Sequence, residues 1–251
     1  GSTPLAADRV AAALVGLGAP GDTVVVWQIR LPRACAAMLV GMALGISGAA
    51  LQGLLRNPLA EPVGVGVSAS ASLGATFVLY YGLAGSLAIA VPVSAVAGAM
   101  LATAFLSIAA VRIGSVVTLI LVGVGLSSFV GALMSLLMNL APNPFSLSDM
   151  VNWMLGSVAN RSLADLRLTF PFIAGGSLLL LASRRALSAL SLGEEAAGAL
   201  GVDLARVRVA VVAGAGLATG GAVALAGAVG FVGIVAPHLV RPLVAHDPAR
   251  T

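Results

Sequence analysis

Long, uninterrupted apolar segments recur along the whole chain, and they constrain its fold more than any other feature. Hydrophobic residues make up 59% of the 251 residues, and charged residues only 9%. So few charges cannot cover a water-exposed surface, which excludes a soluble enzyme, a nucleic-acid-binding protein and a disordered chain. A transmembrane β-barrel would show alternating segments of ~10 residues instead. We therefore expect an all-α, polytopic membrane protein.

Seven membrane spans are predicted, because a helix needs ~20 mostly apolar residues to cross the hydrocarbon core of a bilayer. They cover residues 34–55, 66–83, 87–111, 116–140, 167–183, 207–228 and a short segment at 230–245. Two longer polar connectors separate them, at 141–165 and 184–206. We treat residues 1–251 as a single transmembrane domain in which residues 1–33 form an external segment.

The arginines indicate an orientation, since basic residues favour cytoplasmic loops. Eight of the thirteen arginines fall on one side of the predicted spans, which places the N-terminus outside. The 184–206 loop is then cytoplasmic and the 141–165 insert external. We expect the insert to contain a short interfacial helix capped at Ser148 and Asp149. In the loop we expect two short helices, one with Glu194 and Glu195 in its first turn and Gly201 at its end.

Ionisable groups are nearly absent from the predicted spans, and this limits the energy sources that could drive the transport of a solute. His238 alone lies well inside a span, and we expect it to bond a neighbouring backbone carbonyl rather than relay protons. Secondary carriers usually place carboxylates or histidines in mid-membrane, so energy would have to enter from elsewhere. The sequence contains no phosphate-binding GxxxxGK[ST] loop and no metal-ligand cluster. We expect no catalytic site, no metal site and no cofactor bound by this chain.

An arginine pair marks the outer end of the first span. Arg30 and Arg33 flank Pro32 in the sequence WQIRLPR. They could anchor the end of the span. They could also form a pair of external cations for an acidic protein partner, since guanidinium groups suit carboxylates.

Two further segments combine turn-forming residues with polar side chains. QGLLRNPLAEP, at 52–62, predicts a tight turn, with an ordinary connector as the alternative. GFVGIVAPHLVR, at 230–241, predicts an irregular membrane helix that must be covered by protein or line a cavity. The residues singled out in them are Gln52, Asn57, Pro58, Pro237, His238 and Arg241.

In this order, these segments resemble the permease subunits of ATP-binding-cassette (ABC) importers for vitamin B12, iron–siderophores and haem. That family carries RLPR, Q…NPLA.P, LG..A..LG and G..GF.G...PH..R motifs, which occur here at 30–33, 52–62, 192–201 and 227–241. The resemblance covers essentially the whole chain, and the sequences of the motifs are most similar to those of the vitamin B12 permease. It implies the type II ABC importer permease fold, with about seven of its ten spans present.

The resemblance also implies roles for matching residues. Arg30 and Arg33 would pair with carboxylates of a periplasmic substrate-binding protein. Ser115 and Thr118 would lie at the cytoplasmic gate, and the 116–140 span would line the pathway. The residues that would couple to the ATPase are Gly193, Glu194, Glu195, Ala196, Leu200 and Gly201.

The implied function is that of a multi-pass permease in the bacterial inner membrane. A homodimer of permeases, surrounded by lipid, would work with two ATPase subunits that use ATP and Mg, and with one periplasmic binding protein. The expected cargo is a metal chelate, an iron–siderophore or haem, with vitamin B12 as the alternative. A secondary carrier or a membrane scaffold that moves nothing is the remoter alternative.

Overall fold

The structure, a computed structural model, describes residues 4–62, 66–83, 89–112 and 115–244, and its regular elements in these ranges are all helical. Within them, five helices are long and apolar enough to cross a membrane. They are Pro20–Leu55, Ala90–Arg112, Val117–Asn139, Leu163–Ala182 and Leu204–Ala226. The prediction of an all-α, polytopic membrane protein is confirmed.

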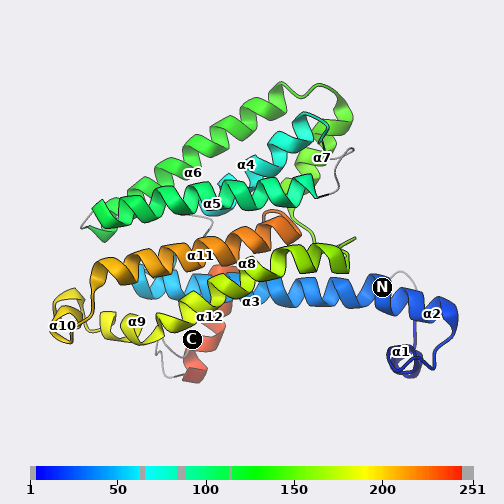
Figure 1. Cartoon of the computed structure of the whole chain (residues 1–251), viewed down its shortest axis with the longest axis horizontal. Coiled ribbons are helices and arrows are strands. Elements are labelled where there is room, and N and C mark those ends of the chain that lie inside the picture. Colours follow the sequence, from blue (N-terminus) through cyan, green and yellow to red (C-terminus); the bar gives the residue numbers. More distant parts are fainter. Residues whose placement is uncertain (1–3, 63–65, 84–88, 113–114, 245–251) are drawn as a thin grey trace.

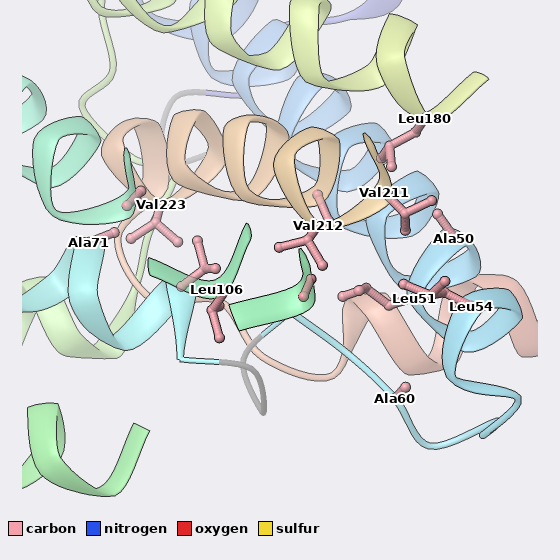
Figure 2. Close-up of a cluster of buried hydrophobic side chains, with 14 of the residues drawn as sticks. Ala50, Leu51, Leu54, Ala60, Ala71, Leu106, Leu180, Val211, Val212 and Val223 are labelled. Atoms are coloured by element: carbon pink, nitrogen blue, oxygen red, sulfur yellow. The ribbon is translucent and has the colours of Figure 1, made fainter. Parts of the chain in front are cut away.

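Helix α11 (Leu204–Ala226) forms the centre of the molecule. It packs against α3 (Leu31–Leu55), α4 (Val67–Tyr80), α5 (Ala90–Arg112) and α8 (Leu163–Ala182). In Figure 1, α3, α8 and α11 lie in one layer, and α4, α5 and α6 in the other. Glycines allow this close packing, since a Cβ at Gly216 would overlap the side chain of Thr103 on α5. Figure 2 shows Val211, Val212 and Val223 of α11 in the apolar cluster between the layers.

Helix α6 (Val116–Asn139) is the least covered of the long helices. Only 22% of the residues in its most apolar 18-residue stretch are buried, against 78% in α11. It contacts α4, α5 and the end of α3, and in Figure 1 it lies at the outer edge of its layer. Its apolar side chains, including Leu121, Val124 and Phe129, are exposed.

The first predicted span begins earlier than Ala34. Helix α2 (Pro20–Val24) continues through a π-helical turn, η1 (Val25–Arg30), into α3. The wide turn directly before Pro32 accommodates the missing proline N–H, so the proline does not end the helix. Helix α1 (Ala7–Leu14) folds back onto this extension, where Arg9 pairs with Asp22 at 2.8 Å. The predicted external segment 1–33 thus contains α1 and, from Pro20 onward, the start of the continuous helix.

The second and seventh predicted spans are also shorter than expected. α4 has 14 residues, and α12 (Val232–Val240) has 9 before a 3₁₀ turn, η3 (Arg241–Val244). Each helix begins after a residue with positive φ, at Gly66 and Phe231. Gly66 lies against Gly123 and Leu126, so α4 starts about halfway along α6. The irregular segment predicted at 230–241 is therefore observed, because non-helical backbone leads into α12.

The two polar connectors contain short helices. In the insert, α7 (Pro144–Leu155) is capped by Asn143, whose side chain accepts a 2.8 Å hydrogen bond from the Ser146 N–H. The predicted cap at Ser148 and Asp149 is wrong, because Asn143 and Pro144 already supply the capping residue and the first helical position. In the 184–206 loop, α9 (Arg184–Leu190) and α10 (Glu194–Ala199) confirm the two predicted helices.

Candidate functional site

Helices α9 and α10 present an exposed surface at one end of the molecule, visible on the left of Figure 1. Glu195, Leu200 and Gly201 are exposed there, with Leu200 67% accessible, while Gly193 and Ala196 are half-buried. Ala197 is buried beneath them. The surface combines apolar side chains with the Glu195 carboxylate and, on α9, the exposed Arg184 and Arg185, a composition suited to contact with another protein.

Glu194 differs from Glu195 although the two are adjacent. Both of its carboxylate oxygens accept hydrogen bonds from Nη2 of Arg208 on α11, at 3.0 and 2.9 Å. The Arg208 side chain is buried, and it makes a further interaction within the molecule. Glu194 therefore fastens α10 to the central helix, whereas Glu195 faces outward. Sequence reasoning missed this pair because nothing in the pattern links an acid with an arginine 14 residues later.

The predicted external cations lie on the continuous helix at the opposite end. Arg33 is exposed at the start of α3, whereas Arg30, in the π-helical turn, is half-buried and already has an interaction within the molecule. Cys35 belongs to the same apolar cluster as Val158 and Leu166, so the connector after α7 lies beside the start of α3.

A second cationic feature, Arg161, lies in that connector. Its guanidinium carbon is 5.4 Å from the ring centroid of Trp153, and its Nε donates to the Ser157 carbonyl. Burial lowers the pKa of Arg161, while nearby Asp165 raises it. Arg161, Trp153 and Asp149 line a cavity of about 650 Å³ at this end. This cavity could not be predicted from the sequence, because it forms only when α7 packs on α4.

Two motifs that are distant in sequence meet in the structure. The Gln52 side chain donates from Nε2 to the Gly233 carbonyl at 3.1 Å, and Arg241 donates to Gln52 Oε1 at 2.6 Å. Backbone contact is close here, since a Cβ at Gly48 would overlap the same carbonyl. Gln52 and Arg241 therefore act together in holding α12 against α3.

The turn that follows α3 has the predicted form. Asn57 Oδ1 accepts a hydrogen bond from the Leu59 N–H at 3.0 Å, which closes the turn around Pro58. Further along, Glu61 accepts a hydrogen bond from the backbone of Phe231, and burial raises the pKa of its carboxyl group. This segment thus also contacts the start of α12.

The remaining predicted residues are more dispersed. Ser115 caps α6, its Oγ accepting a hydrogen bond from the Thr118 N–H at 3.4 Å, and both residues are exposed. Residues 113–114, directly before this predicted gate pair, fall outside the described residues. Pro237 is buried within α12, while His238 is exposed. The backbone hydrogen bond predicted for His238 is not observed in the described part of the chain.

Comparison with known proteins identifies the family. The sequence matches the FecCD transport family over residues 1–251. It is 41% identical over 238 residues to the ABC transporter permease protein YvrB of Bacillus subtilis, covering 93% of this chain and 67% of that protein. It is 38% identical over 226 residues to the cobalamin import system permease protein BtuC of Halobacterium salinarum, covering 89% of this chain and 60% of that protein.

A solved structure supports the same assignment. It is described as an inward-facing, metal-chelate type ABC transporter, and it superimposes with a TM-score of 0.85 at 32% sequence identity. The match covers 96% of this chain and 80% of that one. The described helices thus share both fold and sequence with an ABC transporter. The chain is a multi-pass membrane protein that belongs to the FecCD transport family, whose relatives here are permeases of ABC transport systems.

Proposed function

We propose that this chain is the membrane-spanning permease of a binding-protein-dependent ABC importer, driven by ATP hydrolysis in a separate subunit. The observation that carries the proposal is the α9–α10 surface, which is exposed yet fastened to the central helix α11 by the Glu194–Arg208 pair. A partner that moved this surface would move the helix against which α3, α4, α5 and α8 all pack. Glu195, Leu200 and Gly201 would contact the ATPase, and Gly193 and Ala196 would shape the turn beneath them.

We assign the opposite end to the binding protein. Arg33 offers an exposed guanidinium group on a continuous helix, and Arg30 lies one turn away. Ser115 and Thr118 would lie near the gate at the ATPase end. A second permease would cover the exposed face of α6, enclosing the pathway between two copies.

For the cargo we propose a metal chelate, an iron–siderophore or haem, with vitamin B12 as the alternative. The metal-chelate description of the solved structure favours the first, and the cobalamin import system of the archaeal relative favours the second. Exposed residues on α6 are mostly apolar or small, which suits a large solute that passes without tight binding.

Uptake into proteoliposomes tests the proposal directly. Proteoliposomes that contain the permease, the ATPase and the binding protein should transport the labelled ligand of that binding protein. They should do so only when ATP is supplied on the side of the membrane where the ATPase lies. An ATPase variant that binds but cannot hydrolyse ATP is the control. Accumulation that persists with this variant would contradict the energised-importer mechanism and favour a secondary carrier.

Charge reversal at Arg33 should weaken docking of the binding protein. Arg33→Glu replaces an exposed cation with an anion facing acidic residues of the partner, and we expect at least a tenfold weaker affinity at low salt, equivalent to about 1.4 kcal/mol. The difference should shrink as salt screens the charges. Surface plasmon resonance across a salt series measures it, and Arg112→Glu, at the other end of the molecule, is the matched control. If both variants bound the binding protein with equal affinity, Arg33 would not belong to the docking surface.

A further inference from the structure

The cavity lined by Arg161, Trp153 and Asp149 lies where several long helices end. Its walls come from α7, the last turns of α4 and α11, and the first turns of α5 and α8. These helix ends lie toward the right of Figure 1. Because α5, α8 and α11 are each long enough to cross a membrane, their ends lie at the depth of the lipid headgroups. Chemical groups of the bilayer surface are therefore close to this cavity.

Arg161 brings unused hydrogen-bond donors to the cavity. Its guanidinium group lies over the Trp153 ring, and its Nε donates to the Ser157 carbonyl. In the described part of the chain neither Nη atom has a partner, and neither is among the buried unpaired atoms, so both remain accessible. A planar guanidinium group pairs best with a carboxylate or a phosphate. The free N–H groups therefore favour an anionic oxygen group.

The connector that carries Arg161 is fixed to the central helix. The Ser157 N–H donates to the Ala226 carbonyl at 2.6 Å, and the Ser157 carbonyl accepts from Arg161. The backbone is closely packed here, since a Cβ at Gly156 would overlap the Ala228 carbonyl. The guanidinium group is thus held in place before a ligand arrives, which lowers the entropic cost of binding.

Two carboxylates, those of Asp149 and Asp165, line the same cavity. One Asp165 oxygen accepts hydrogen bonds from the N–H and Oγ of Ser162, at 2.9 and 2.8 Å. Among the described residues the Asp149 side chain has no partner, and neither carboxylate forms an ion pair with Arg161. A simple anion would be repelled by the carboxylates, and a simple cation by Arg161. The arrangement therefore suits a ligand that carries both charges.

We propose that this cavity binds a phosphoethanolamine group, the headgroup of the membrane lipid phosphatidylethanolamine. The phosphate would meet the Nη groups of Arg161, and the ammonium group would meet the carboxylate of Asp149. The cavity volume, about 650 Å³, lies within the ~300–1,000 Å³ of small-molecule sites. Leu155, 75% exposed, also lines it and offers an apolar contact to the acyl chains. Such a site requires neither an ATPase nor a binding protein, so it is independent of the proposed transport function.

Isothermal titration calorimetry of the permease in a non-ionic detergent tests the charge requirement. The three probes are phosphoethanolamine, inorganic phosphate and ethanolamine, which carry both charges, the anion alone and the cation alone. We expect phosphoethanolamine to bind about tenfold more tightly than either of the others, because only it satisfies both sides of the cavity. The proposal is overturned if phosphate or ethanolamine binds as tightly.

Variants assign the two charges to their residues. Asp149→Asn should abolish the preference for phosphoethanolamine over phosphate, and Arg161→Gln the preference over ethanolamine. Arg167→Gln is the matched control, since Arg167 is exposed on α8 and does not line the cavity. Asp149 makes no side-chain hydrogen bond in the described chain, so its variant keeps the test valid even if Arg161→Gln folds poorly. Unchanged preferences in Asp149→Asn, or an equal loss in Arg167→Gln, would overturn the assignment.

Competition with intact lipids identifies the source of the bound group. Phosphatidylethanolamine should displace phosphoethanolamine from the detergent-solubilised permease, and native mass spectrometry should detect the bound lipid. Phosphatidylglycerol, which has the phosphate but no ammonium group, should do neither. If phosphoethanolamine binds but the lipid does not displace it, the lipid source is wrong and the ligand is a soluble zwitterion. None of these measurements needs ATP, so their failure is distinct from a failure of ATP-driven uptake.

Discussion

Gly48→Ala is expected to force α3 and α12 apart and to destabilise the permease strongly. A Cβ at this position would overlap the Gly233 carbonyl, which is backbone and cannot rotate away. Overpacking of this kind costs about 1–3 kcal/mol. Loss of the hydrogen bond from Gln52 to the same carbonyl adds about 1 kcal/mol. We expect a total of about 3 kcal/mol, measured as a lower melting temperature of the detergent-solubilised protein.

The same helix offers a matched control. A Cβ at Gly41 would meet nothing within 4 Å, so Gly41→Ala should leave the melting temperature unchanged or raise it slightly, as alanine favours the helix. Gly41 and Gly48 lie seven residues apart in α3, so they stand on nearly the same face of that helix. If the two variants melt alike, the contact between α3 and α12 is not as close as the structure shows.

Glu194→Ala is expected to release α10 from the central helix, whereas Glu195→Ala should leave it in place. The first variant removes two charge-assisted hydrogen bonds to the buried Arg208 side chain. Breaking a fully buried pair costs about 3–5 kcal/mol. Glu194 is partly exposed and Arg208 keeps a further interaction, so we expect about 2–3 kcal/mol. Amide hydrogen exchange of α9 and α10, without the ATPase, should rise accordingly.

The matched variants separate folding from docking. Glu195→Ala should change exchange little, since exposed substitutions are usually within about 0.5 kcal/mol, yet it should weaken association with the ATPase. Arg208→Ala should reproduce the exchange of Glu194→Ala, and the double variant should be less destabilised than the sum of the two. Unchanged exchange in Glu194→Ala would show that the pair does not hold α10.

The long helices could be predicted from the sequence because apolar length alone decides whether a segment can cross a membrane. The two short helices of the 184–206 loop could be predicted from local signals, with Glu194 and Glu195 at a helix start and Gly201, at φ 84°, after its end. Their functional roles remain predictions, as does the docking role of Arg33.

The failed predictions share one cause, which is that distant segments decide the outcome. The sequence suggested a membrane span at 66–83 and a short one at 230–245, both longer than α4 and α12, because hydropathy does not reveal where non-helical backbone enters the protein interior. Likewise, the partner of Gln52 lies 181 residues away, and that of Arg241 lies 189 residues away. Such contacts have no local signature, so the structure was needed to find them.

The continuous helix from Pro20 to Leu55 has a mechanical consequence. Its 36 residues span about 54 Å at 1.5 Å per residue, well beyond the ~30 Å of a hydrocarbon core. α1 holds the N-terminal end of this helix through the Arg9–Asp22 ion pair, while α9 and α12 contact its α3 portion. The helix can therefore act as a lever: a tilt of about 5° would displace one tip by about 5 Å relative to the other. A displacement at the arginine end would then move the part of α3 that contacts α9 without any change in the helix itself.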